Sequence, residues 1–278
     1  MMGNSLFARL IALRADIEGY PNRVIGLMTS SYFFGFAIKT LRAASLINQV
    51  GHIRNFAAFS AITSAVILSF LLVLEPSWVG LRMIMGASIA GCFVVNESWL
   101  TNRATNQNRG ILLSIYMIIV YLASAISQQS LRLGDPGCFN IFPYAGILLA
   151  LSIVPIPLTR ATHSDPVQKP QVDIRQLLFI SPTAVLGCII SGIVLGSLWD
   201  LGPVYAHMQG LRVNQIATFM SISVVGGLLF QIPIRCLSDH FDRRKALLTV
   251  SIPAMLAALL LSIGSRFNRQ YVFKCRLF

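Results

Sequence analysis

Charge is what this sequence lacks most. Only 12% of its 278 residues are Asp, Glu, Lys or Arg, whereas an ordinary soluble domain carries about 25%. Hydrophobic residues make up 55% of the chain, a content that excludes an intrinsically disordered protein. The same content is too apolar for a soluble domain of this size, so the composition indicates a membrane protein.

Long stretches without any charge set the fold class. Each is about as long as the roughly 20 residues that a helix needs to cross a bilayer; they are residues 55–74, 111–131, 138–159, 176–199, 213–234 and 246–265. Two more stretches, 22–47 and 78–100, are similarly apolar apart from a few charged residues. We therefore predict an all-α integral membrane protein with about eight transmembrane helices.

Acidic residues are scarce as well: 10 Asp and Glu stand against 22 Lys and Arg. The loops after the first, third, fifth and seventh expected spans hold ten basic residues: Arg54, Arg103, Arg109, Arg160, Lys169, Arg175, Arg235, Arg243, Arg244 and Lys245. The loops on the other side hold only Arg132 and Arg212. This bias places the basic loops in the cytoplasm. Because it alternates with the spans, it favours the lipid bilayer over nucleic acid as the partner.

Motifs for catalysis and metal binding are also missing. The five cysteines (Cys92, Cys138, Cys188, Cys236 and Cys275) show no disulfide or zinc-type spacing. The chain contains no phosphate-binding loop, no zinc-protease motif and no nucleophile elbow. We expect no cofactor, no metal and no enzymatic activity.

The ends of the chain differ from its middle. The run SLFARLIAL is too short for a signal peptide and is interrupted by Arg9. Basic residues at both ends conflict with the orientation rule, which favours a chain truncated at both ends. The expected domains are an extracytoplasmic segment left from a first span (1–21), a five-span bundle (22–159), a cytoplasmic linker (160–177), a three-span bundle (178–265) and a basic tail (266–278).

A weak internal repeat supports the division into two bundles. Shifting residues 25–54 forward by 191 positions aligns Ile25 with Ile216 and Gly35 with Gly226. The same shift aligns Asn48 with Asp239. Repeated halves are common in secondary transporters, whose substrate site lies between them.

The most highly charged loop is RCLSDHFDRRK, residues 235–245. It resembles the signature loop of the major facilitator superfamily, G-x-L-x-D-R-x-G-R-R/K. The matching residues are Leu237, Asp239, Arg243 and Arg244; Arg235, His240 and Asp242 depart from the pattern. The first-half loop SLINQVGHIR keeps Leu46, Gly51 and Arg54 but has Asn48 in place of the acid.

Longer stretches are similar to one branch of that superfamily, the YcaD-type transporters of the bacterial inner membrane. They are GHIRNFAAFSA, ESWLTNRATNQNRG and GCIISGIVLGSLWDLGPVYA. The resemblance implies twelve spans in two bundles, of which this chain would run from the end of helix one to helix nine. It also implies a monomeric secondary transporter that moves a small solute by alternating access. The resemblance does not decide whether this transport is coupled to protons. The competing hypothesis is a truncated, transport-inactive remnant.

Two sets of residues are candidates for gating between the halves. The signature loops supply Leu237, Asp239, Arg243, Arg244 and Lys245 in one copy and Asn48, Gly51 and Arg54 in the other. Family resemblance implies that the second copy faces Asn108, Arg109 and Gly110. The alternative is that the basic residues of these loops only fix the topology.

Polar residues inside the expected spans are candidates for a substrate or proton pathway, because they are costly there. They are Glu97, Arg82, Gln128, Asp200, Lys39 and Arg42. Glu97 could instead be a helix-end carboxylate, and Arg82 could extend to the membrane interface. Asp200 stands where the family has a glycine, which favours a change particular to this chain. Lys39 and Arg42 either line a central cavity or mark a loss of function.

Small residues four apart predict close helix contacts in the sixth span. The two pairs are Gly187 with Ser191 and Gly192 with Gly196.

Overall fold

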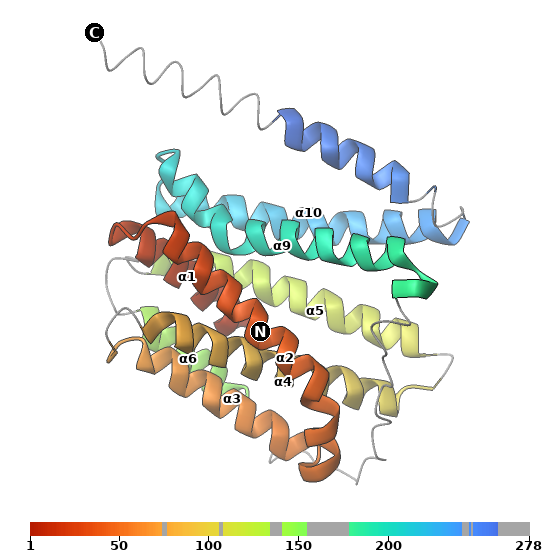
Figure 1. Cartoon of the computed structure of the whole chain (residues 1–278), viewed down its shortest axis with the longest axis horizontal. Helices are drawn as coiled ribbons and strands as arrows, with labels where there is room; N and C mark the ends of the chain where they lie inside the picture. The colour runs from red at the N-terminus through yellow and green to blue at the C-terminus, as the bar shows by residue number, and fades with distance from the viewer. Residues whose placement is uncertain are drawn as a thin grey trace. The chain divides into compact units, whose positions relative to one another are not determined.

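The computed structural model describes residues 1–73, 77–105, 108–133, 141–154, 178–240, 245 and 247–260, and in these parts the chain is helical without a strand. The helices are α1 (Met2–Ile17), α2 (Asn22–Val50), α3 (His52–Ser69), α4 (Trp78–Arg103), α5 (Arg109–Gln129), η2 (Ser130–Leu133), α6 (Ile141–Leu151), α9 (Pro182–Met208) and α10 (Val213–His240) (Figure 1). The expected all-α class is confirmed.

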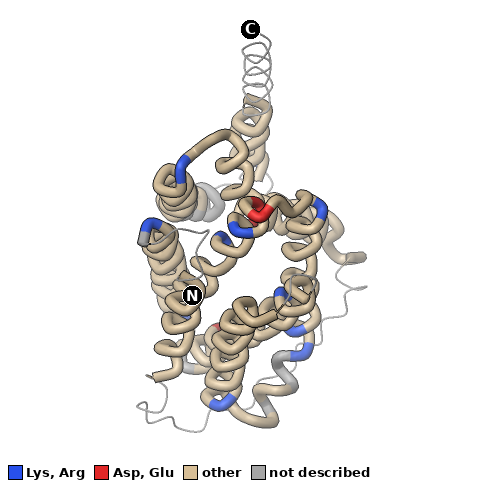
Figure 2. Tube along the Cα trace, turned by 90° about the vertical axis from the view of Figure 1, so that its left-hand side faces the viewer, with Lys and Arg blue, Asp and Glu red and all other residues tan. Residues whose placement is uncertain are grey.

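Five segments of the described chain are long and apolar enough to cross a membrane: Asn22–Arg42, Trp78–Asn102, Arg109–Arg132, Pro182–Met208 and Val213–Phe230. The described parts of the other three expected spans also contain helices, namely α3, α6 and Leu247–Leu260. Figure 2 shows how few charged residues interrupt these helices.

The sixth expected span is longer than its uncharged stretch. That stretch ends at Trp199, and α9 continues to Met208, with Asp200 inside the helix as the sequence indicates. The helix passes through Asp200, which is only 4% exposed. A charged residue therefore does not end this helix, because its carboxylate has a partner inside the bundle.

The chain divides into two compact units, residues 1–225 and 226–278. The first contains α1 to α9 and the start of α10. In the second, the described parts are the rest of α10, Lys245 and the helix Leu247–Leu260. The domain boundaries expected from the sequence stay a prediction.

In the first unit α1 packs against α5, α6 and α9, while α2 and α3 pack against α4. Most of α1 is buried, and the ring of Phe7 contacts Phe70 and Phe142 edge-on, with centroids 4.9 and 5.8 Å apart. This interior position explains why a helix of only 16 residues forms: packing of its apolar side chains stabilises it more than helix propensity does.

The α2–α4 crossing depends on two glycines. A Cβ at Gly35 would lie 2.0 Å from the carbonyl oxygen of Met83, and one at Gly86 would lie 2.0 Å from that of Tyr32. Backbones can approach this closely only where side chains are absent. Among the described residues, nothing lies within 4 Å of a Cβ placed at Gly187 or Gly192. Of the close contacts expected in this span, the described residues show one at Gly196, where a Cβ would lie 2.9 Å from the ring of Phe33.

The helices follow the 191-residue repeat. α2 begins at Asn22 and α10 at Val213, which is the shift of the repeat. The aligned Ile25 and Ile216 are 1% and 0% exposed, so the two helices use equivalent residues for packing within the first unit.

Candidate functional site

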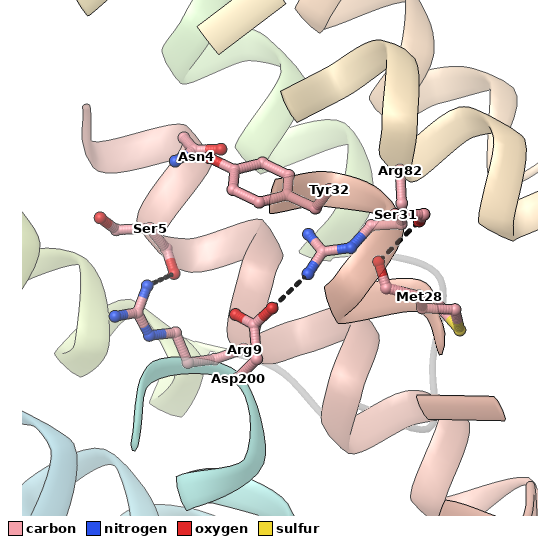
Figure 3. Close-up of polar contacts among 8 residues, drawn as sticks. All are labelled: Asn4, Ser5, Arg9, Met28, Ser31, Tyr32, Arg82 and Asp200. Carbon is pink, nitrogen blue, oxygen red and sulfur yellow. Dashed lines mark hydrogen bonds and ion pairs between the residues drawn. The ribbon is translucent and has the colours of Figure 1, made fainter. Parts of the chain in front are cut away.

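A buried ion pair joins α4 to α9. Nη2 of Arg82 donates to Oδ2 of Asp200 at 2.7 Å, and the two residues are 1% and 4% exposed (Figure 3). Removing one partner of such a pair leaves an uncompensated buried charge, so each residue requires the other. α4 belongs to the first five expected spans and α9 follows the expected linker. The pair therefore connects the two expected halves.

Arg9 of α1 lies beside the same part of α9. Its side chain is buried, its Nη1 donates to the carbonyl oxygen of Ser5 at 2.7 Å, and its Cζ lies 4.7 Å from the ring centroid of Trp199. This is a cation–π contact with the residue next to Asp200. Among the described residues, Arg9 forms no ion pair with a carboxylate.

Tyr32 of α2 lies on the other side of Arg82. The centroid of its ring is 4.9 Å from Cζ of Arg82, and its hydroxyl accepts a hydrogen bond from Nδ2 of Asn4 at 3.5 Å (Figure 3). Ser5 also contacts α5, because its hydroxyl lies 3.0 Å from that of Ser124. Four helices thus contribute to one polar group within an apolar bundle. We call it the arginine cluster: Asn4, Ser5, Arg9, Tyr32, Arg82 and Asp200.

Several buried polar atoms of this cluster, and of Gln128 in α5, have no hydrogen-bond partner in the described part of the chain. They are Oδ1 of Asn4, Nε of Arg9, Nε and Nη1 of Arg82, and both amide atoms of Gln128. Buried polar atoms are nearly always paired in folded proteins, so each of these unpaired atoms requires an explanation.

Further polar contacts connect α9 and α10 to the other helices at one end of the first unit. Nδ1 of His207 lies 2.6 Å from Oδ2 of Asp16, and Nε2 of Gln129 donates to the hydroxyl of Ser221 at 2.6 Å. Arg132 donates to the carbonyl oxygen of Asn214 at 3.3 Å and to the hydroxyl of Thr218. We call this end, marked by residues 17–22, 130–133 and 208–213, the closed end.

The opposite end differs. Residues 182–195 of α9 are exposed except Val185, whereas most of residues 196–206 are at least partly buried. We call the end marked by residues 50–52, 103–105, 108–109 and 178–182 the open end (Figure 1). In the described part of the first unit, the polar contacts of α9 and α10 with the other helices therefore gather at the closed end.

The pathway candidates separate into two groups. Arg82 and Asp200 come together, and the alternative in which Arg82 extends to the membrane interface is wrong, because Arg82 is buried inside the protein. Gln128 is also fully buried. Glu97 and Arg42 are exposed. The ammonium of Lys39 lies 4.5 Å from the ring centroid of Phe59 in α3, so it packs within the first expected bundle.

The gating candidates are described only in part. Leu237 and Asp239 lie in the backbone of α10 and Asn48 in that of α2, but their side chains are outside the description. Arg243 and Arg244 lie outside the described residues. The others that the structure describes are all exposed: Lys245, Gly51, Arg54, Asn108, Arg109 and Gly110. Their gating role stays a prediction.

The first-half loop nevertheless shows why it turns where it does. Gly51 separates α2 from α3 with φ 86° and ψ 163°, a conformation open almost only to glycine. Nδ2 of Asn55 donates to the carbonyl oxygens of Leu46 and Gly51 at 2.9 and 2.8 Å, which stabilises the end of α2. Within the described residues no group of three His, Cys, Asp or Glu side chains could hold a metal.

Comparison with known proteins identifies the family. The sequence pattern of the Major Facilitator Superfamily matches residues 1–273. This chain belongs to the major facilitator superfamily. Members of this family are transporters embedded in the membrane, and the apolar helices of the described chain agree with a multi-pass membrane protein.

Three bacterial relatives of this chain are also described as MFS-type transporters. An uncharacterized MFS-type transporter named YcaD, from Escherichia fergusonii, is 33% identical over 237 residues, which cover 84% of this chain and 62% of the relative. An MFS-type transporter from an Enterobacter species is 31% identical over 259 residues, which cover 92% of this chain and 68% of the relative. One from Yersinia pestis is 29% identical over 237 residues, covering 84% and 62%. The matches of this chain thus span 62–68% of these relatives' lengths.

The arginine cluster was only partly visible in the sequence. Arg82 and Asp200 were candidates, but their pairing joins positions 118 residues apart. In the sequence, Arg9 stands out only as a charged residue that interrupts the apolar run SLFARLIAL. A signal did exist: a buried positive charge in one span and a negative charge in another are expected to pair, because neither is stable alone in an apolar bundle.

Proposed function

We propose that this protein is a secondary active transporter that carries a small solute across the bacterial inner membrane by alternating access. Membership of the superfamily and the relatives' description as transporters support a transport role. The observation that carries the mechanism is the difference between the two ends of the first unit.

Contacts between the expected halves are concentrated at the closed end. Arg82 with Asp200, Asp16 with His207 and Gln129 with Ser221 each join a helix of the first five expected spans, or α1, to α9 or α10. At the open end, α9 is exposed over residues 182–195. By the distribution of basic loops the open end faces the cytoplasm. This arrangement corresponds to a transporter that is open inward.

The contacts at the closed end are of a kind that can be exchanged. Besides the buried ion pair they are the contact of His207 with the Asp16 carboxylate and hydrogen bonds of Gln129 and Arg132. A hydrogen bond has a net worth of about 0.5–1.5 kcal/mol, or about 1.5–3 kcal/mol when one of its groups is charged. A second state of similar free energy can therefore break them and form others at the open end. We expect a monomer to carry out the cycle.

The test uses the purified protein in proteoliposomes on a solid-supported membrane. Solutes are applied by class, namely sugars, amino acids, carboxylates and organic cations, with and without an imposed proton gradient. At least one class is expected to give a saturable current, and the dependence on the gradient distinguishes coupled from passive transport.

A reversible crosslink provides the matched control. The hydroxyl of Ser221 lies 3.4 Å from the carbonyl oxygen of Ala125, which makes positions 125 and 221 suitable for cysteines joined by a short thiol crosslinker. In a background without native cysteines, crosslinking A125C with S221C should abolish the current, and a cleavable linker should allow its recovery. No saturable current from any class would contradict the proposal and favour a transport-inactive protein.

A further inference from the structure

We propose that the arginine cluster, together with Gln128, is a binding site for a small monocarboxylate; this inference rests on the proposed transport function and names its substrate class. The arginine cluster carries a net positive charge. It holds two buried guanidinium groups, Arg9 and Arg82, and one buried carboxylate, Asp200. Among the described residues one positive charge is left without a counter-ion, and such a buried charge is costly.

The two arginines of the cluster also have N–H groups that donate to none of the described residues. Nε of Arg9 and both Nε and Nη1 of Arg82 have no partner among the described residues, although both side chains are at least nine-tenths buried. A guanidinium presents its N–H groups in a fork that matches the two oxygens of a carboxylate. The atoms that lack partners are therefore donors of the kind that a carboxylate accepts from.

Gln128 extends the site onto α5. It lies one helical turn beyond Ser124, just as Arg9 lies one turn beyond Ser5, and the hydroxyls of the two serines are 3.0 Å apart. The side chain is fully buried, and neither its amide oxygen nor its amide nitrogen has a partner within the described chain. An amide at this level can both donate to a carboxylate and accept from a hydroxyl group on the ligand.

Asp200 explains both the choice of a carboxylate and the way the empty site is stabilised. Its carboxylate already occupies one donor of Arg82, so it acts as an internal substitute for the ligand. A solute with one negative charge would bring the cluster to neutrality, and it would share or take over the donors of Arg82. Neutralising Asp200 should therefore strengthen anion binding, which a purely structural role of Asp200 does not predict.

Trp199 provides the readout, because its ring contacts Arg9. The chain has three tryptophans, and the variant W78F/W99F leaves Trp199 as the only one. Acetate, propionate and lactate are titrated into this protein in nanodiscs at constant ionic strength. Chloride, methylammonium and glycerol serve as the inorganic, cationic and neutral controls. A saturable change in Trp199 fluorescence is expected with at least one carboxylate and with none of the controls.

Two variants in the same background decide the assignment. Arg9→Gln keeps the ion pair of Arg82 with Asp200 but removes the surplus charge, so the carboxylate affinity should fall about 10- to 100-fold, the loss expected for one charged hydrogen bond. Asp200→Asn should raise the affinity roughly 10-fold. Arg212→Gln is the control, since it removes the same charge from an exposed residue at the closed end and should leave the affinity unchanged.

The results separate this inference from the transport proposal. Carboxylate binding that is lost in Arg9→Gln supports the site even if no current is measured in proteoliposomes. A saturable current with a neutral or cationic solute, without carboxylate binding, would overturn the site while the transport function stands. Equal carboxylate affinity in Arg9→Gln and the parent protein would overturn it as well. Should Asp200→Asn fail to fold, Arg9→Gln alone decides the outcome.

Discussion

The two parts of α9 have similar composition and different surroundings. Residues 182–195 and 196–208 are both rich in apolar side chains, yet Val194 is 60% exposed and Val204 is 4% exposed. The second part is also where Asp200 and His207 meet other helices. Apolar composition places a helix in the membrane, but the polar contacts determine which part of it is attached to the rest of the protein.

The largest effect is expected where the second part of α9 holds its buried charge. Arg82→Gln leaves Asp200 without its partner, so the free energy of unfolding should fall by about 3–5 kcal/mol. Thermal unfolding in detergent, followed by tryptophan fluorescence, measures the change. Arg54→Gln, at an exposed residue, is the control and should change stability by less than about 0.5 kcal/mol. Similar losses of unfolding free energy in Arg82→Gln and Arg54→Gln would contradict a stabilising role of the buried charge pair.

A pair of identical substitutions compares the two parts directly. Val204→Ala removes buried methyl groups and should cost about 1–3 kcal/mol, because it takes away packing and leaves a cavity. Val194→Ala, ten residues earlier in the same helix, should cost less than about 0.5 kcal/mol. The same unfolding assay distinguishes them. Equal costs would mean that the first part of α9 is packed as well as the second.

Substitutions of two neighbouring glutamines on α5 are expected to differ less in their effect on the free energy of unfolding. Gln129→Leu removes the hydrogen bond to Ser221 and should cost about 1 kcal/mol. Gln128→Leu replaces an amide whose two polar atoms lack partners in the described residues, so its stability should be unchanged or higher. If Gln128→Leu proves the more destabilising of the two, the amide of Gln128 already has a partner in the folded protein.

The smallest effect is expected at two glycines of α9. Gly192→Ala adds a methyl group where the described chain leaves space, so better helix propensity should raise stability by about 0.5–1 kcal/mol. At Gly196 the added Cβ would meet the ring of Phe33 at 2.9 Å, so Gly196→Ala should gain nothing or lose stability. Equal gains at both positions would show that the contact at Gly196 is loose.

Local features of the sequence were enough for the fold class but not for the site. The uncharged runs predicted helices because a span must satisfy its backbone internally, and each of the eight expected spans contains a helix in its described part. Asp200 could be placed inside its span from the sequence, but its ion-pair partner could not be named. The partner, Arg82, comes from a distant helix. Sequence periodicity carries no information on that contact.

Glycine spacing predicted the close contact at Gly196, but the described residues show none at Gly187 or Gly192. Gly187 and Gly192 have neighbours at the right spacing on their own helix, but close approach also requires a second helix at that level. Gly35 and Gly86 meet this condition across α2 and α4, and their pairing depends on the crossing of two helices rather than on either sequence alone.

A double-mutant cycle between Arg82 and Asp200 tests the central claim most directly, namely that a buried ion pair joins the two expected halves at the closed end. The unfolding free energies of the parent, Arg82→Gln, Asp200→Asn and the double variant give the coupling between the two side chains. We predict a favourable coupling of about 2–3 kcal/mol, with the double variant more stable than Arg82→Gln. A coupling near zero, with additive losses, would contradict the contact between α4 and α9 and the closed end that depends on it.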